Sequence, residues 1–357
     1  MPLLLDRFDR TIDYLRVSVT DRCNFRCVYC MPEEGFPCTP KEEHLSAEEF
    51  ARIIGVAAGL GMSKVRFTGG EPLLRKDLPE IVRAARDAGV VDLSATTNGH
   101  RLPEMAEPLA AAGLSRVNIS LDTLRPDRFT AIARRGSLEI VLEGIRAAVE
   151  AGLAPVKLNV VALRGINDDE AADFAAWTLR EPVHVRFIEV MPMRWNLDEG
   201  PSMEAFSPHG GAGLLQIRQA PGGMLSDADM RRRFVPCEEL MASIEAVHGK
   251  LEPADLRTNG PARTFRLAGA PGTVGFISQI SNDLCSRCNR LRLTHDGFLR
   301  GCLMSDGELD LRNPIRSGAT DEEIRALFEH VVAHKPERHY LAEGQRVTGR
   351  GMSQIGG

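Results

Sequence analysis

The sequence predicts an α/β protein whose main part is a partial (β/α)6-type barrel, followed by a smaller C-terminal domain. Short β-rich runs alternate with helical stretches between residues 14 and 191, which is the pattern of parallel strands joined by crossover helices. Each run has one apolar and one polar face, and the loops that follow the runs carry cysteine, glycine and methionine. We expect the barrel to occupy residues 1–249 and the smaller domain to occupy residues 250–357.

Six runs form the expected barrel strands, in the order YLRVSVT, KVRFTGG, VDLSATTNG, SRVNISLDT, PVKLNVVAL and VHVRFIEVMP. Side chains alternate with period two along a strand, so the apolar residues share a face that helices can cover. The opposite face would line a barrel lumen with polar and cationic side chains, which include Arg16, Lys64, Arg66, Thr96, Ser120, Lys157 and Arg186. A cationic lumen is costly unless an anion fills it, so we expect an anionic ligand there. The alternative is a different strand register, with these residues on solvent-exposed faces.

Residues 194–236 interrupt the alternation with a Gly/Pro-rich sequence that has no clear period. We expect a long loop insertion there, either a lid or a disordered segment. A helix near residues 237–248 would close the first domain. Beyond it we expect β-like runs in ARTFRLA, GTVGFISQI and RLRLTHDGFL, a helix near residues 320–333 and a glycine-rich tail.

Composition narrows the cellular setting. The chain has 357 residues and a net charge of −5, which disfavours broad, sequence-independent nucleic-acid binding because such binding neutralises many phosphates. No stretch approaches the roughly 20 apolar residues of a membrane span, and the apolar start of the chain runs straight into charged residues. We therefore expect a cytoplasmic protein that binds neither nucleic acid nor membrane.

The eight cysteines are the strongest chemical signal in the sequence. In a reducing compartment clustered cysteines are more often metal ligands than disulfides, and six of them form two trios: Cys23, Cys27 and Cys30, then Cys285, Cys288 and Cys302. Structural zinc sites and electron-transfer 4Fe–4S clusters usually take four protein ligands, so a trio leaves one position open for a small molecule. The alternative is zinc completed from elsewhere, with His295 available to the second trio. Cys38 and Cys237 are interpreted as incidental thiols.

Two motifs together resemble the radical S-adenosylmethionine (SAM) enzymes: CNFRCVYC at 23–30 after the first strand, and GGEP at 69–72 after the second. The second trio with CNRLRLT, together with YLRVSVTDRC, VRFIE and the terminal GG, is similar to the MoaA family of GTP 3′,8-cyclases in molybdenum cofactor biosynthesis. The resemblance covers nearly the whole chain. It departs at 194–236, which looks longer than the family loop.

The resemblance implies a lyase with two 4Fe–4S clusters, one on each cysteine trio, the second in the smaller domain. SAM would bind the open iron of the first cluster and yield a 5′-deoxyadenosyl radical, and the guanine of GTP would bind at the second. Removal of the ribose 3′ hydrogen and attack on guanine C8 would give (8S)-3′,8-cyclo-7,8-dihydroguanosine 5′-triphosphate. The alternative is a radical SAM maturase acting on a peptide or RNA, which would predict a four-cysteine auxiliary site and, for RNA, a basic surface.

The resemblance and the shared lumen face also imply residue roles. SAM contacts fall on Tyr29, Gly70, Glu71, Ser120 and Met191. The expected GTP-binding residues are Arg16, Lys64, Arg66, Thr96, Lys157, Arg186, Arg290, Leu291 and Arg292. Residues expected to take part in catalysis are Arg16, Arg290, Arg292, Gly356 and Gly357. The implied partners are an external electron donor, the downstream cyclic pyranopterin monophosphate synthase and a second copy of the chain in a homodimer.

Overall fold

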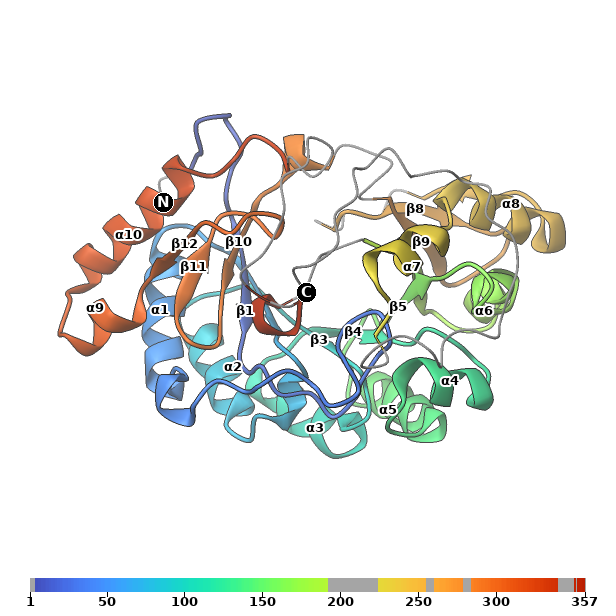
Figure 1. Cartoon of the computed structure of the whole chain (residues 1–357), viewed down its shortest axis with the longest axis horizontal. Helices are drawn as coiled ribbons and strands as arrows, with labels where there is room; N and C mark the ends of the chain where they lie inside the picture. The colour runs from blue at the N-terminus through green and yellow to red at the C-terminus, as the bar shows by residue number, and fades with distance from the viewer. Residues whose placement is uncertain are drawn as a thin grey trace.

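The computed structural model describes residues 4–191, 224–254, 260–278, 284–339, 350 and 352–356. Within these ranges all the named strands belong to one 12-stranded sheet, in the order β12-β11-β10-β1-β2-β3-β4-β5-β6-β9-β8-β7. The sheet curves around an interior that the C-terminal end of the chain enters (Figure 1). This arrangement confirms the predicted α/β fold with a partial barrel.

The six central strands coincide with the six predicted runs. They are β1 (Tyr14–Ser18), β2 (Lys64–Thr68), β3 (Asp92–Thr97), β4 (Arg116–Ser120), β5 (Lys157–Ala162) and β6 (His184–Glu189). Each pairs in parallel with the next. Their apolar residues, such as Leu15, Phe67 and Val117, are fully buried in the main hydrophobic cluster. Burial of this face against helices removes apolar surface from water and orients the polar face inward.

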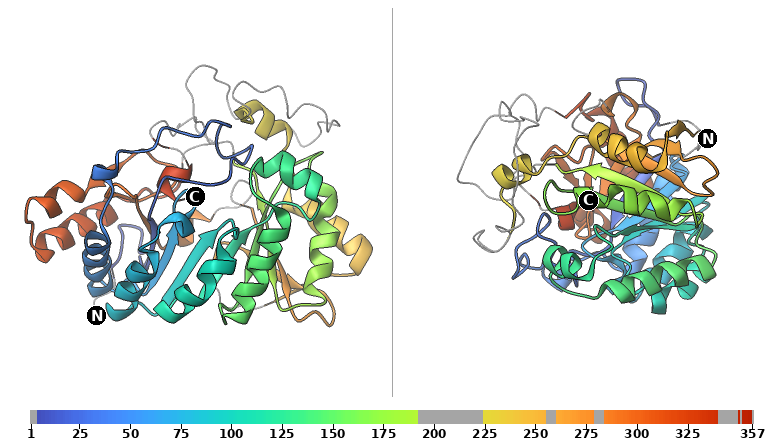
Figure 2. Two further views of the ribbon diagram at one scale, coloured as in Figure 1. Left: turned by 90° about the horizontal axis from the view of Figure 1, so that it is seen from below. Right: turned by 90° about the vertical axis from the view of Figure 1, so that its right-hand side faces the viewer.

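Helices cover the outer face of the sheet, as the left view of Figure 2 shows. They are α1 (Ala47–Gly59), α2 (Leu78–Asp87), α3 (Leu102–Ala112), α4 (Pro126–Ala133), α5 (Leu138–Glu150) and α6 (Ala171–Thr178), with short 3-10 helices η1 (Lys41–Glu43), η2 (Pro72–Leu74) and η3 (Asp168–Glu170). α1 begins at a capping box, in which the side chains of Ser46 and Glu49 accept each other's backbone N–H groups. None of the helices in the described ranges is long and apolar enough to cross a membrane.

Strands that follow residue 250 extend both edges of the same sheet. β9 (Thr273–Ile277) pairs in parallel with β6 and leads to β8 (Arg263–Arg266) and β7 (Glu252–Pro253). At the other edge β10 (Arg290–Leu293) pairs in parallel with β1, followed by β11 (Phe298–Arg300) and β12 (Glu308–Asp310). Thus the second half of the chain flanks the barrel interior from two sides. A domain boundary near residue 249 stays a prediction.

The remaining helices are α8 (Cys237–His248), α9 (Arg312–Arg316), α10 (Asp321–Ala333) and α11 (Met352–Ile355). α8 and α10 confirm the helices predicted near 237–248 and 320–333. α10 lies beside α1, where Arg52 pairs with Asp321 at 2.8 Å. This contact joins the C-terminal part to the first helix of the barrel.

The segment predicted as a loop at 194–236 contains a helix. Residues 192–223 lie outside the described residues. The helix α7 (Asp227–Arg232) lies within the segment predicted as a loop, so the prediction is wrong for this stretch. The helix begins at a capping box between Ser226 and Asp229. Leu225, Met230 and Phe234 are buried in a small hydrophobic cluster. Burial in tertiary contacts therefore stabilises a helix too short to be evident in the sequence.

Candidate active site

The inner face of the sheet encloses a cavity of about 330 Å³. Most of the predicted site residues line it: Arg16, Cys23, Cys27, Tyr29, Cys30, Arg66, Gly70, Glu71, Thr96, Ser120, Arg186, Met191, Cys285, Cys288, Arg290, Arg292 and Cys302. Arg186 is only 7% exposed and Arg292 only 5%. The polar strand faces therefore form a lumen, and the alternative of solvent-exposed faces is wrong.

The first cysteine trio lies on the loop that follows β1. Cys27 starts a turn in which its carbonyl oxygen accepts from the backbone nitrogens of Cys30 at 2.8 Å and Met31 at 3.1 Å. The three thiols are half-buried against the cavity. Burial raises the pKa of Cys23 to about 11 and that of Cys30 to about 12, because a thiolate loses its hydration there. Thiolates at this position need a bound cation, which fits a metal cluster.

The second trio lies near the opposite ends of the strands from the first trio. Cys285 and Cys288 precede β10, the first of them in the 3-10 helix η7 (Cys285–Arg287), and Cys302 follows β11. β10 runs parallel to β1 and β11 runs antiparallel to β10, so this trio lies near the beginning of β1 rather than its end. Burial opposes ionisation of Cys288, but the charges of Lys335 and Arg290 outweigh it and lower the pKa of this thiol. The cavity therefore has one cysteine trio toward each end of the strands.

His295, which could complete a zinc site at the second trio, belongs to a different cluster of side chains. In the described part of the chain, the only three potential ligand atoms within 4.8 Å of one another come from Asp21, His44 and His295. His295 thus belongs to another cluster, with Nε2 3.4 Å from Oδ2 of Asp21. His295 follows β10 whereas Cys285 and Cys288 precede it, so the structure does not place His295 to complete a zinc site at the second trio.

The GGEP loop packs directly on the first cysteine loop. The backbone nitrogens of Gly70 and Glu71 donate to the carbonyl oxygens of Thr20 and Arg22, both at 2.7 Å. A Cβ on Gly70 would lie 2.3 Å from the carbonyl oxygen of Arg22, so only glycine allows this approach. The side chain of Glu71 accepts hydrogen bonds from Thr97 Oγ1 and the Asn98 backbone, both at 2.7 Å, which fix it against the end of β3.

Tyr29 and Asp122 form one wall of the cavity next to the first trio. The Tyr29 hydroxyl donates to Oδ2 of Asp122 at 2.6 Å, and Oδ1 accepts from the Val161 backbone nitrogen at 2.9 Å. Burial raises the pKa of Asp122 to about 6. Ser120 and Met191 line the cavity beside this pair. All the residues expected to contact SAM thus lie in one cavity.

Cationic side chains gather at the N-terminal ends of the central strands. Arg66 donates to Oγ of Ser94 at 3.2 Å, and Arg186 donates to the amide oxygens of Asn118 at 2.6 Å and Asn159 at 2.7 Å. Burial, reinforced by Arg186 and other arginines, lowers the pKa of Lys157 to about 7. Such closely packed cations favour binding of a polyanion.

Acidic residues offset the positive charge of two cations at the rim of this cluster. Lys64 forms an ion pair with Asp13, and Arg116 forms one with Asp92 at 2.6 Å. Lys64 and Lys157 do not line the main cavity but a small adjoining one, shared with Arg66, Arg116 and Arg186. A ligand in the main cavity could therefore reach Arg66 and Arg186 first.

The C-terminal tail enters the cavity beside β1 and β2. Nη1 of Arg292 donates to the carbonyl oxygens of Ile355, at 3.3 Å, and Gly356. Gly356 has φ +70°, and a Cβ there would lie 2.4 Å from Cγ2 of Thr68. Figure 1 shows α11, the short red helix, on the inner side of the curved sheet beside β1. Gly357 lies outside the described residues.

Leu291 is the one predicted GTP-binding residue whose side chain points away from the lumen. It is fully buried in the main hydrophobic cluster, next to Leu15 on β1. The reason is the strand period of two, which turns Leu291 outward while Arg290 and Arg292 turn inward. A contact between Leu291 and a lumen ligand would have to come from its backbone.

Comparisons with known proteins agree with this geometry. Residues 17–178 match the radical SAM superfamily, and residues 219–341 match the family Molybdenum Cofactor Synthesis C. The chain is 49% identical to the GTP 3′,8-cyclase of Moorella thermoacetica over 354 residues, which cover 99% of each protein. It is also 49% identical to that of Heliobacterium modesticaldum over 357 residues, 99% of this chain and 100% of the relative. The chain belongs to the GTP 3′,8-cyclase family.

Membership of this radical SAM family makes the chain an enzyme, a radical SAM lyase, which implies a 4Fe–4S cluster and SAM. The first cysteine trio and the cavity next to it fit both groups. Among solved structures, SuiB from Streptococcus suis bound to S-adenosylmethionine is 17% identical, with a TM-score of 0.42, over 51% of this chain and 42% of that one. Membership of the GTP 3′,8-cyclase family confirms the resemblance found from the motifs.

Two residues of this cyclase-family site were not identified from the sequence, Arg116 in the small adjoining cavity and Asp122 in the main one. Arg116 follows the same period of two as Asn118 and Ser120, so the alternation on β4 could have revealed it. Asp122 stands in the LDT loop after β4, where a functional residue is expected at a C-terminal strand end. Only its 2.6 Å hydrogen bond to Tyr29, however, shows which group it positions.

Proposed function

We propose that this chain converts GTP to (8S)-3′,8-cyclo-7,8-dihydroguanosine 5′-triphosphate, the first step of molybdenum cofactor biosynthesis. The observation that carries the proposal is one cavity of about 330 Å³ that contacts both cysteine trios and has cations along its wall. A nucleotide bound between the trios would have its base toward one and its ribose toward the other. Its triphosphate would meet the cationic cluster.

In this proposal Cys23, Cys27 and Cys30 hold the cluster that binds SAM. Tyr29, Gly70, Glu71, Ser120 and Met191 contact SAM, because they line the cavity around this trio. When bound, the cluster and SAM supply the 5′-deoxyadenosyl radical chemistry. The chain's own contribution is to position the bound groups. Asp122 holds the Tyr29 ring in the cavity wall, and Glu71 fixes the loop after β3 through the backbone nitrogen of Asn98.

The second trio, Cys285, Cys288 and Cys302, would hold a second 4Fe–4S cluster with an open iron for guanine. Arg16 on β1 is in register with Arg292 on the neighbouring strand β10, and Arg290 is in register with Tyr14. These three arginines would orient the reacting part of the nucleotide. Arg66, Lys157 and Arg186 would hold the triphosphate, because each guanidinium group can bind two phosphate oxygens and the Lys157 ammonium adds a point charge.

The partners follow from the chemistry. Reductive cleavage of SAM consumes an electron, so an external electron donor is required. The cyclised nucleotide would pass to cyclic pyranopterin monophosphate synthase. A homodimer and a cytoplasmic location stay predictions.

The test is anaerobic incubation of the reconstituted protein with dithionite, SAM and GTP. We expect 5′-deoxyadenosine to form in proportion to a cyclised nucleotide that is an isomer of GTP with the same mass, separated from GTP by chromatography and identified against a synthetic standard. ATP in place of GTP should give neither. Formation of 5′-deoxyadenosine that requires a peptide or RNA, and not GTP, would favour the maturase alternative instead.

A further inference from the structure

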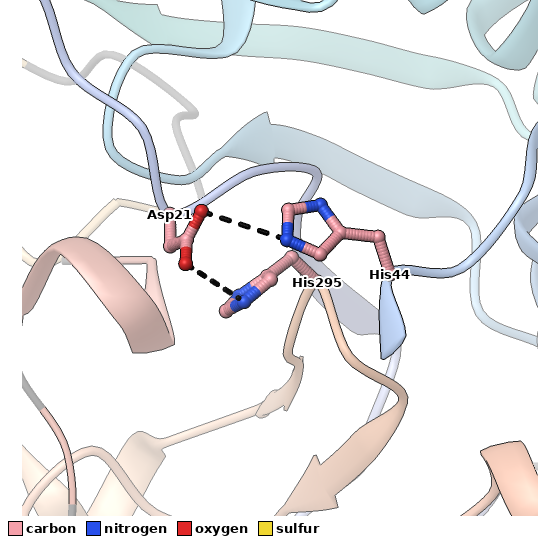
Figure 3. A group of neighbouring side chains, drawn as sticks. All are labelled: Asp21, His44 and His295. Carbon is pink, nitrogen blue, oxygen red and sulfur yellow. Dashed lines mark ion pairs between the residues drawn. The ribbon is translucent and has the colours of Figure 1, made fainter. Parts of the chain in front are cut away.

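A cluster of two histidines and one aspartate lies outside the cavity just described. Asp21 follows β1, His44 precedes α1, and His295 follows β10, so three segments far apart in the chain meet here (Figure 3). Each residue offers one ligand atom, and the three atoms lie within 4.8 Å of one another. Asp21 is 8% exposed and His295 is fully buried. Neither imidazole takes part in the proposed cyclase reaction.

We propose that Asp21, His44 and His295 bind one Zn²⁺ ion, which is separate from both cysteine trios. Nε2 of His295 lies 3.4 Å from Oδ2 of Asp21, and Nε2 of His44 lies 3.7 Å from Oδ1. Tetrahedral zinc with bonds of about 2.0–2.2 Å to nitrogen and oxygen places its ligand atoms roughly 3.3–3.6 Å apart. The two imidazoles thus face different oxygens of one carboxylate near the spacing that zinc requires, and the widest pair of ligand atoms, at no more than 4.8 Å, would close by about 1.2 Å on binding.

The carboxylate of Asp21 has an oxygen available for the ion. Oδ2 accepts from the backbone nitrogen of Thr39 at 2.6 Å. Oδ1 is buried and has no hydrogen-bond partner among the described residues. A buried carboxylate oxygen without a hydrogen bond is costly, and a coordinated cation would remove this cost.

The imidazoles can turn the required nitrogens toward the carboxylate without rearrangement of the backbone. Nε2 of His44 lies 3.1 Å from the carbonyl oxygen of Thr39, and Nε2 of His295 lies 3.0 Å from its hydroxyl oxygen. In the zinc-bound form both rings would carry their proton on Nδ1, and the Thr39 hydroxyl would turn its proton away. Nδ1 of His295 is buried and has no hydrogen-bond partner among the described residues, so its proton would need a water, or a side chain that shifts slightly, as acceptor. The side chain of His44 is 15% exposed, which leaves a path for the ion and for a water ligand in the fourth position.

The donor set and its position indicate what the ion would do. Two imidazoles and one carboxylate suit zinc, whereas the thiolates of the trios suit iron–sulfur clusters. The ion would join the loop that leads to Cys23 with the turn after β10, the strand that carries Arg290 and Arg292. The backbone nitrogen of Leu45 donates to the carbonyl oxygen of His295 at 2.9 Å, which already joins the His44 segment to the turn after β10. Zinc would therefore brace the contact between the first cysteine loop and the substrate-binding strand.

The experiment uses the anaerobic holoenzyme with both cysteine trios loaded with iron. One equivalent of Zn²⁺ is added, unbound metal is removed by desalting, and zinc and iron are quantified. Zinc K-edge X-ray absorption then identifies the ligands. We expect about one zinc per chain, with nitrogen or oxygen neighbours at about 2.0–2.2 Å, no sulfur neighbours at about 2.3 Å, and unchanged iron.

Substitutions locate the site. His44→Gln and His295→Gln should each lose most of the retained zinc. His334→Gln is the matched control, because it removes one ring of the exposed His330–His334 pair on α10 and should leave zinc retention unchanged. Iron content and circular dichroism establish that each variant is folded.

A second readout does not depend on the variants. Chelation of zinc from the wild-type holoenzyme should lower its thermal unfolding temperature, and added Zn²⁺ should restore it, because a ligand that binds only the folded state stabilises it. Sulfur neighbours around zinc, no retained zinc in the wild type, or retention of zinc at the wild-type level in both variants would each overturn the proposal. None of these results would bear on cyclisation of GTP.

Discussion

Nζ of Lys335 lies 3.5 Å from the thiol sulfur of Cys288 and donates to the carbonyl oxygen of Arg290 at 3.0 Å. The lysine is only 2% exposed and also contacts the carbonyl oxygen of Gly301. A buried ammonium group held against a cysteine favours the thiolate and adds positive charge next to any cluster bound there. Lys335 is therefore expected to position Cys288 and to set the electronic properties of the second site.

Replacing Lys335 with Met should make the reduction potential of the second cluster more negative. Loss of a nearby positive charge disfavours the reduced cluster, and a shift of about 60 mV corresponds to a tenfold change in a one-electron equilibrium. Electron paramagnetic resonance during a redox titration measures it. Lys250→Met is the control, because Lys250 is exposed and remote in sequence from both trios. An unchanged potential in the Lys335 variant would show that the lysine only packs the loop.

Replacing Cys285, Cys288 and Cys302 together with Ala should lower the iron content from about eight to about four per chain, as expected for the loss of one four-iron cluster. Reductive cleavage of SAM should remain possible, because the first trio is intact. Cys38 is exposed and lies in neither trio, so Cys38→Ala serves as the control. Iron and sulfide analysis after anaerobic reconstitution gives the result, and an unchanged iron content would contradict two clusters.

Replacing Arg66 or Lys157 with Ala should weaken GTP binding by roughly 10- to 150-fold, the effect of losing a charge-assisted hydrogen bond worth about 1.5–3 kcal/mol. SAM binding should change much less, since Lys157 lies at the beginning of β5 and Arg66 in the middle of β2, whereas the first trio follows the end of β1. Equilibrium binding of each ligand checks this, with Arg146→Ala on the exposed side of α5 as control. Equal losses for GTP and SAM would instead indicate damage to the fold.

GTP affinity should fall as pH rises above about 7, because Lys157 has a pKa of about 7 in the free protein. A bound triphosphate favours the charged ammonium and raises this pKa, so binding above pH 7 takes up a proton. Affinity then falls by up to tenfold per pH unit until the pKa of the complex is reached. Calorimetry at pH 8 in buffers of different ionisation enthalpy measures the uptake. Lys157→Met should abolish it, and equal uptake in this variant would assign the proton elsewhere.

Substituting Gly356 should suppress cyclisation without loss of clusters or of GTP affinity. In Gly356→Ala the new methyl group meets Thr68 in a backbone conformation that favours glycine, so the tail is displaced from Arg292. Deleting Gly356 and Gly357 should have the same effect, and a synthetic tail peptide should restore part of the activity. Product formation per cleaved SAM is measured. Gly318→Ala is the matched control, since Gly318 has φ +88° but nothing within 4 Å of the added Cβ.

Wild-type product formation by the truncated enzyme would show that the tail has no catalytic part. Reduced GTP affinity in the truncated enzyme would instead make the tail part of substrate binding. Gly318→Ala should retain full activity even if it is slightly less stable, because the cost of its backbone conformation is local.

Local patterns in the sequence determined the barrel and most of its lumen. The period of two along β1 to β6 predicted both the buried face and the inward side chains, because strand geometry alone fixes that alternation. Cysteine spacing identified both trios, and apolar periodicity identified α8 and α10. The short α7 was missed, since its stability depends on burial rather than on its own sequence.

Only the tertiary structure decided which distant residues meet. Strand pairing placed β9 beside β6 and β10 beside β1, which brought the second trio to the opposite end of the cavity from the first. It also joined Tyr29 to Asp122, Lys335 to Cys288, and Asp21 to His44 and His295. These contacts depend on long-range packing, because residues far apart in a chain become neighbours only when the whole sheet has formed. The sequence by itself therefore determined which kinds of metal-binding and anion-binding side chains this protein has, and the fold determined which of them share a site.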